Sequence, residues 1–143
     1  MIDNFYIVGH KERNVMQETA IKYFTPKEAQ KTLPLVKQII RDIINNSFQI
    51  RTIVESMGGD IYENEEVKKL AREIDGFIKE LEEIGCFYKD WNFSIGLVDF
   101  PAIIDGKEVY LCWRSDEEEI KYYHDIDKGF ADRKPIPQNY LDE

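Results

Sequence analysis

The sequence predicts an α+β fold in which a long antiparallel helical hairpin, similar to a coiled coil, packs on a small three-stranded antiparallel sheet. Two observations predict it. In the first half of the chain, apolar residues recur alternately every four and every three positions, which is the spacing of helices that pack along a seam. In the second half, apolar and polar residues alternate on both sides of an Asp-Gly pair, a pattern typical of a β-hairpin.

Composition limits the classes of function. The chain has 143 residues, enough for one domain with its own core, and 43% of them are hydrophobic. It carries 19 basic and 28 acidic residues, which gives a formal charge of −9. Nucleic acids and anionic membrane surfaces attract basic proteins, so we expect neither as a partner.

The N-terminus and the cysteine content indicate the compartment. No segment approaches the roughly 20 apolar residues of a membrane span, and the first residues do not read as a signal peptide. The two cysteines, Cys86 and Cys112, fit a reducing environment, so we expect a cytoplasmic protein. The native chain begins at either Met1 or Met16, and the sequence leaves this open. Three parts are expected: a flexible extension at 1–22, an α+β domain at 23–136 and a C-terminal tail at 137–143.

The first helix is predicted over about 26–57. Its start is marked by the hydroxyl of Thr25, the proline at position 26 and the carboxylate of Glu28, which together form a capping box with proline in the first turn. One polar residue interrupts an otherwise apolar seam, which consists of Ala29, Leu33, Val36, Ile40, Ile43, Ser47, Ile50, Val54 and Met57. The turn Gly58-Gly59-Asp60 is expected to end this helix.

A second helix is predicted over about 63–84, with Gly85 as its C-terminal cap. Its seam consists of Val67, Leu70, Ile74, Phe77, Leu81 and Ile84. Because the first helix is about ten residues longer, part of its apolar stripe must pack elsewhere. The sheet and a second copy of the chain are both candidates, so self-association through the hairpin is one expectation.

Three strands are predicted, over about 97–104, 107–114 and 119–124, with Asp105-Gly106 as the turn between the first two. Side chains alternate between the two faces of a strand, so this turn decides which residues share a face. The face towards the helices is expected to carry Val98, Phe100, Ala102, Val109, Leu111 and Trp113. The opposite, polar face is expected to carry Asp99, Glu108, Tyr110, Cys112 and Arg114, with Lys121 and Tyr123 from the third strand.

The polar face is the first candidate site. In the predicted register, Asp99, Cys112 and Arg114 are neighbours across two strands. One interpretation is a solvated face with an Asp99–Arg114 ion pair, which contributes about 0–1 kcal/mol and implies no function. The other is a shallow pocket in which Arg114 binds an anion.

The segment after the third strand is the second candidate. His124 ends that strand, and the loop behind it could bring Arg133 back to the sheet. If the third strand is regular, however, His124 lies on the face opposite Asp99 and Cys112. That geometry, and the lack of CxxC or HExxH spacing, argue against a metal held by these three residues and against catalysis by Cys112. The candidate ligand-binding residues are Asp99, Glu108, Tyr110, Cys112, Arg114, His124, Asp127 and Arg133.

Three stretches of sequence resemble an uncharacterised family of small prokaryotic domains of unknown function. The first is Tyr23-Phe24-Thr25-Pro26-Lys27-Glu28-Ala29 with Leu33-Pro34-Leu35-Val36; the second runs from Gly96 to Ala102 and from Gly106 to Arg114; the third contains His124, Asp127, Gly129-Phe130 and Arg133. The resemblance covers roughly Tyr23 to Ile136 and implies no activity or cofactor. This chain has Tyr123 where the resemblance leads us to expect tryptophan, and Asp132 where it leads us to expect glycine.

The sequence therefore leaves the function unknown and three hypotheses open. The first is a binding module, in which the polar face and the loop after it receive a small anionic ligand or a protein partner. The second is a small enzyme, with or without a metal, that uses His124 or Asp99 as acid or base and Arg114 as anion clamp. The third is a purely structural role for these polar residues.

Overall fold

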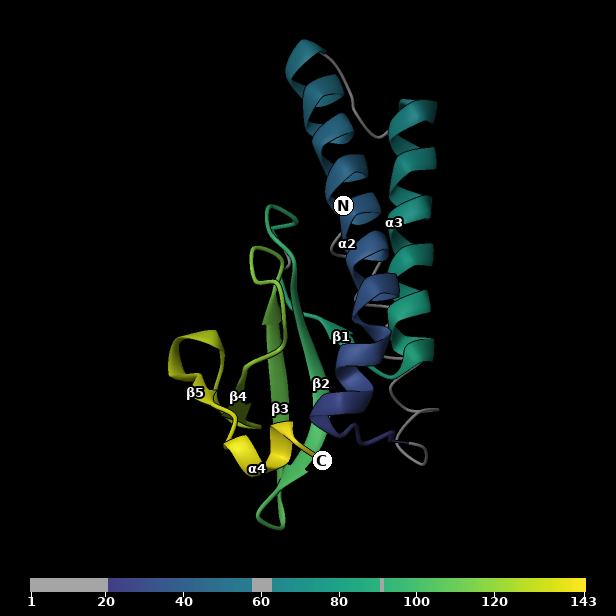
Figure 1. Cartoon of the computed structure of the whole chain (residues 1–143). Coiled ribbons are helices and arrows are strands. Elements are labelled where there is room, and N and C mark those ends of the chain that lie inside the picture. Colours follow the sequence, from purple (N-terminus) through teal and green to yellow (C-terminus); the bar gives the residue numbers. More distant parts are fainter. Residues whose placement is uncertain (1–20, 58–62, 91) are drawn as a thin grey trace.

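The structure is a computed structural model that describes residues 21–57, 63–90 and 92–143. Two long helices precede a set of antiparallel strands, so the α+β class is confirmed (Figure 1). The elements are α2 (Pro26–Ser56), α3 (Glu65–Ile84), β1 (Phe87–Tyr88), β2 (Leu97–Ile104), β3 (Lys107–Arg114), β4 (Tyr122–Asp125), the 3-10 helix η2 (Phe130–Asp132), β5 (Lys134–Pro135) and α4 (Gln138–Leu141). The predicted flexible extension, apart from its last two residues, and the predicted Gly58-Gly59-Asp60 turn lie outside the described residues.

Side chains cap the N-termini of both helices, and a glycine ends α3. The Thr25 hydroxyl accepts a hydrogen bond from the Glu28 N–H (3.1 Å), and the Glu28 carboxylate accepts one from the Thr25 N–H (3.0 Å). At the start of α3, the Asn64 side chain accepts a hydrogen bond from the Val67 N–H. The helix ends at Gly85, whose φ of 110° is favourable only without a Cβ.

The two helices lie side by side and cover one side of the sheet (Figure 1). Because α2 has 31 residues and α3 has 20, the first turns of α2 extend beyond α3. Leu33, near the start of α2, belongs to the same buried core as the sheet, and the ring of Phe24, just before α2, lies 5.3 Å from that of Phe100 on β2, so the sheet packs against the start of α2. Four residues of the predicted α3 seam are buried, but Phe77 and Ile84 are only partly buried, and Ile78, which the seam left out, is fully buried. An α-helix repeats every 3.6 residues, so its packing face drifts away from a strict heptad.

The sheet has five strands in the order β1-β2-β3-β4-β5, so the prediction of three strands is wrong. The two additional strands, β1 and β5, contain two residues each and are too short for an alternating pattern to indicate them. The third predicted strand is also shorter and later than expected: β4 covers Tyr122–Asp125 instead of about 119–124.

The hairpin between β2 and β3 has the predicted bounds and register. Asp105 and Gly106 form the turn with φ values of 53° and 76°, and Asp99 pairs with Cys112. The apolar face predicted for this hairpin is buried against the helices, and it contains Val98, Phe100, Ala102, Val109, Leu111 and Trp113.

The C-terminal residues, predicted as a tail, include the short helix α4. The Tyr140 hydroxyl accepts a hydrogen bond from the Asp105 N–H (2.7 Å) and donates one to the Asp105 carboxylate (2.9 Å), which ties α4 to the β2–β3 turn. None of the helices in the described part of the chain combines the length and the apolar character that a membrane crossing requires.

Candidate metal centre

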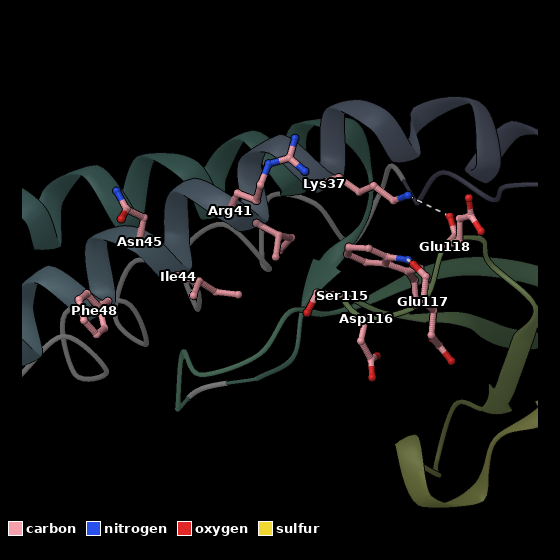
Figure 2. A pocket seen from close by; sticks show the side chains of 11 residues that line it. Lys37, Arg41, Ile44, Asn45, Phe48, Ser115, Asp116, Glu117 and Glu118 are labelled. Carbon is pink, nitrogen blue, oxygen red and sulfur yellow. Dashed lines mark hydrogen bonds between the residues drawn. The ribbon is translucent and has the colours of Figure 1, made fainter.

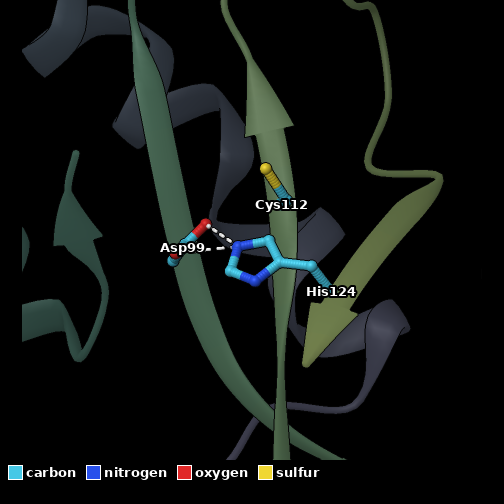
Figure 3. Close-up of side chains that lie close together, drawn as sticks. All are labelled: Asp99, Cys112 and His124. Atoms are coloured by element: carbon cyan, nitrogen blue, oxygen red, sulfur yellow. Dashed lines mark hydrogen bonds and ion pairs between the residues drawn. The ribbon is translucent and has the colours of Figure 1, made fainter. Parts of the chain in front are cut away.

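Three neighbouring strands bring three potential metal ligands to the outer face of the sheet. Asp99 on β2 pairs with Cys112 on β3, and His124 on β4 pairs with Tyr110, two residues from Cys112 on the same face. One ligand atom from each of Asp99, Cys112 and His124 lies within 4.8 Å of the other two (Figure 3). The three side chains come from separate parts of the sequence, so only the strand register brings them together.

The prediction that His124 lies on the opposite face is wrong. It assumed a regular strand from residue 119, but β4 begins at Tyr122, and its register places His124 opposite Tyr110. Tyr123, which was predicted on the polar face, is opposite Leu111, a residue of the face against the helices. A shift of one residue moves every side chain of a strand to the other face.

All three side chains are shielded from solvent. Asp99 and His124 are each 3% exposed and Cys112 is 1% exposed. His124 Nε2 lies 3.2 Å and 3.1 Å from the two Asp99 oxygens, and its Nδ1 lies 2.8 Å from the backbone oxygen of Asp125. A carbonyl oxygen only accepts hydrogen bonds, so Nδ1 carries a proton and donates a hydrogen bond to the backbone oxygen of Asp125. Nε2 is therefore the nitrogen directed at Asp99.

The surroundings shift the pKa values of two members of the cluster. The hydrogen bond to Asp99 raises the pKa of His124 above its ordinary value, although burial opposes the rise. Burial raises the pKa of the Cys112 thiol to about 12, with a smaller contribution from the negative charge of Asp99. Without a cation, the cluster thus favours a neutral Cys112 thiol and makes His124 easier to protonate than an isolated histidine.

A pocket of about 230 Å³ opens directly beside the cluster. Asp99, Tyr110, Cys112 and His124, all expected on sequence grounds, line it. It is also lined by residues that the sequence did not single out as a site, namely Lys89, Leu97, Ile126 and Lys128, together with Gly129 and Phe130. Lys89 directly follows the two-residue strand β1, which gave no periodic signal, so nothing in the sequence indicated that it lies near Asp99.

The two arginines that were candidates for anion binding are engaged within the protein. Arg114 Nε lies 3.2 Å from the Asp116 carboxylate but makes no hydrogen bond with the described residues, so Arg114 forms its ion pair with Asp116 and not with Asp99 as predicted. Arg133 returns to the sheet, as the loop was expected to allow, and donates a hydrogen bond to Glu117 (2.8 Å). Both guanidinium groups also lie over the ring of Phe130, at 5.3 Å and 4.0 Å from its centroid.

The remaining two candidates lie outside the pocket. Glu108 is exposed and accepts a hydrogen bond from the hydroxyl of Tyr23. Asp127 is also exposed, in the loop after β4. The structure therefore brings Asp99, Tyr110, Cys112 and His124 together and leaves these two carboxylates apart.

A larger depression, of about 860 Å³, lies between α2 and the turn after β3 (Figure 2). Ile40, Ile44 and Phe48 form much of its wall, and at one end the Lys37 ammonium donates a hydrogen bond to the Glu118 backbone oxygen (2.9 Å). On size alone, this depression would be the preferred candidate for the functional site. Within the described residues, however, the only group of three side chains able to hold a metal is the one on the opposite face of the sheet. We therefore place the candidate site there.

The fold and the cluster together define an α+β protein with a buried Asp-Cys-His group on the outer face of an antiparallel sheet. Residues 22–136 match the model of a family described as an uncharacterized conserved protein (DUF2203), and the chain belongs to that family. No curated protein and no solved structure matches the chain. The family carries no assigned function, so any functional argument has to come from the site itself.

Proposed function

We propose that this protein binds one divalent transition-metal ion, with zinc as the best fit, through Asp99, Cys112 and His124. The observation that carries the proposal is the convergence of a carboxylate, a thiol and an imidazole, all buried, with ligand atoms within 4.8 Å of one another. Buried polar side chains normally pair within the protein, and three ligand types that zinc accepts rarely meet at one point without a reason.

The distances are close to those of a zinc site. Bonds of about 2.0–2.3 Å in tetrahedral geometry separate the ligand atoms by roughly 3.3–3.6 Å. His124 Nε2 and the Asp99 oxygens, at 3.1 Å and 3.2 Å, are already near this separation. The widest separation in the cluster is at most 4.8 Å, so closing it needs a movement of about 1 Å, which a side-chain rotation supplies. A thiolate ligand favours zinc over magnesium or calcium, which prefer oxygen.

The hydrogen bond from His124 Nδ1 to the Asp125 carbonyl supports the same proposal. Histidine ligands usually donate their second N–H to a backbone carbonyl or a carboxylate, which fixes the ring and its tautomer. The 2.8 Å contact holds the ring with Nε2 towards Asp99 and Cys112. Metal binding would displace the proton on Nε2 and the proton of the Cys112 thiol, so we expect binding to release protons and to strengthen with rising pH.

Three protein ligands leave the fourth position of a tetrahedral site open, and the 230 Å³ pocket lies beside it. A metal ion held by three protein ligands can bind a ligand at its open position or activate a water molecule there. As metal ligands, Asp99 and His124 are not available as general acid and base. Their role as metal ligands therefore replaces the acid–base role that the enzyme hypothesis gave Asp99 and His124.

The test is the metal content of the full-length protein, untagged and purified without chelators, measured by mass spectrometry. We expect close to one zinc per chain, and its loss in Asp99→Asn, Cys112→Ser and His124→Gln. The chain supplies matched controls, because Cys86 and His10 are its only other cysteine and histidine. Cys86→Ala and His10→Gln should retain the metal. A native protein that takes up no metal from added zinc, or a Cys112→Ser variant that binds it equally well, would refute the proposal.

Two further expectations belong to this proposal. A cytoplasmic location is supported by the two free thiols of Cys86 and Cys112, because disulfides form mainly in oxidising compartments and free thiols are usual in reducing ones. Association with a second copy or with a protein partner is supported by Phe48, which is exposed on α2 and lines the larger depression together with Ile40 and Ile44. Light scattering coupled to gel filtration tests the self-association, with Phe48→Ser as the variant expected to reduce it.

A further inference from the structure

The pocket beside the three ligands differs in charge from the rest of the protein. The chain as a whole carries a formal charge of −9, yet among the described residues the pocket is lined by two lysines, Lys89 and Lys128, and a single carboxylate, Asp99. A zinc ion held by one carboxylate and one thiolate is neutral as a unit, so the lysines would leave the loaded pocket with a charge of about +2. An anionic ligand is therefore favoured in a protein that repels anions overall.

These two lysines are available to a ligand. Within the described residues, neither has an ion-pair partner, whereas Arg114 and Arg133 are held by Asp116 and Glu117. The backbone N–H of Lys89 donates to the Leu97 oxygen (2.7 Å), which extends the pairing of β1 with β2 and anchors Lys89 at the pocket.

Two observations place the ammonium group of Lys89 near the cluster. It lies 5.4 Å from the centroid of the Tyr110 ring, a lining residue whose ring is itself 5.7 Å from that of His124. Its positive charge also acts on His124, where it opposes the rise in pKa. Lys89 is thus within electrostatic reach of any group bound at the open metal position.

The rest of the pocket indicates a small ligand with an apolar part. Its volume of about 230 Å³ lies below the roughly 300–1,000 Å³ of drug-sized pockets. Leu97, Ile126 and Phe130 contribute apolar surface to its lining. A short organic acid satisfies both features, because its apolar end covers these side chains and its charged end reaches the lysines.

We infer that the pocket binds a small organic oxyanion, a carboxylate or a phosphate ester, with one oxygen at the open metal position and its charge paired with Lys89 and Lys128. This inference rests on the proposed metal centre and adds the class of its ligand. Carboxylates and phosphates share the chemistry that these residues recognise, so the experiment has to separate them.

The test uses full-length protein loaded with cobalt(II), which takes zinc sites and absorbs visible light. Propionate, inorganic phosphate and propyl phosphate are titrated in turn, and neutral propionamide serves as the uncharged control. We expect at least one of the anions to change the visible spectrum in a saturable way, and propionamide to leave it unchanged. Lys89→Met should raise the apparent Kd about tenfold, since it removes one charged hydrogen-bonding group. Lys121→Met is the matched control, because Lys121 is exposed, lies outside the pocket and pairs with Glu119; it should not change the Kd.

The outcomes separate this inference from the proposed function. Cobalt that binds with a thiolate charge-transfer band but responds to no anion, or responds equally in Lys89→Met, overturns the oxyanion inference and leaves the metal centre intact. A cobalt-treated protein without such a band overturns both. Saturation by propionate alone identifies a carboxylate pocket, and saturation by the phosphates alone identifies a phosphate pocket.

Discussion

Arg133 is expected to hold the loop that forms one wall of the pocket, and replacing it tests that role. Its side chain is 13% exposed, and Nη1 lies 2.8 Å from Glu117 Oε1. The guanidinium also lies 4.0 Å from the centroid of the Phe130 ring and 4.4 Å from that of Tyr122. Since Phe130 lines the pocket, Arg133→Met should loosen this wall as well as destabilise the protein.

The size of the effect follows from these contacts. A hydrogen bond between charged groups contributes about 1.5–3 kcal/mol when partly buried. Each cation–π contact adds about 0.5–1 kcal/mol, and the methionine side chain keeps part of the apolar contact of the arginine stem. We therefore expect Arg133→Met to lower the free energy of unfolding by about 3 kcal/mol. For a chain of this length that corresponds to a fall in Tm of about 10 °C.

The assay is urea unfolding followed by tryptophan fluorescence, carried out as a double-mutant cycle with Glu117→Gln. Glu117 Oε1 also accepts a hydrogen bond from the Arg114 N–H (2.8 Å). A glutamine oxygen can retain that bond while the charge is lost, so the cycle isolates the ion pair. We expect a coupling energy of about 1–2 kcal/mol between positions 117 and 133.

A coupling energy below about 0.3 kcal/mol would refute this reasoning, since that is the error of additivity for independent sites. Arg133 would then be free to contact a ligand, as the sequence led us to expect. Arg41→Met is the control, because Arg41 is exposed on α2 and bonds only to Gln38 in the described contacts. Its effect should stay within about 0.5 kcal/mol.

Two glycines and one glutamate give further predictions. Gly85→Ala should destabilise the protein by about 1–2 kcal/mol, because φ is 110° there and a Cβ would lie 3.3 Å from the Phe24 ring. Gly76→Ala, inside α3 with nothing within 4 Å of the new Cβ, should instead stabilise it by about 0.5–1 kcal/mol; thermal melts of both variants check the opposite signs. Glu28→Gln should be less stable than the native protein at neutral pH, because the hydrogen bond from the Thr25 backbone lowers the pKa of Glu28. The difference is fully present above the unfolded pKa of about 4.5 and should vanish as the pH falls through the lower, folded value; a gap that persists in melts at low pH would contradict this.

The sequence by itself determined the elements whose signals are local. The capping box at Thr25, the Gly85 cap and the Asp105-Gly106 turn depend on residues within a few positions of one another, and all three are present as predicted. The turn also determined the register of β2 with β3, so the pairing of Asp99 with Cys112 was predictable. Alternation along these two strands then identified the face that packs on the helices.

Tertiary structure decided the composition of the site. β4 is joined to β3 by a connection of seven residues, 115–121, and no short turn fixes its register. A one-residue difference in its pairing register decides whether His124 faces the helices or faces Asp99. The same limit applies to Lys89, which a two-residue strand brings to the pocket, and to Arg133, which Glu117 and two aromatic rings hold. Their positions depend on pairing between strands and on contacts across the loop, and a periodicity within one segment carries no information about either.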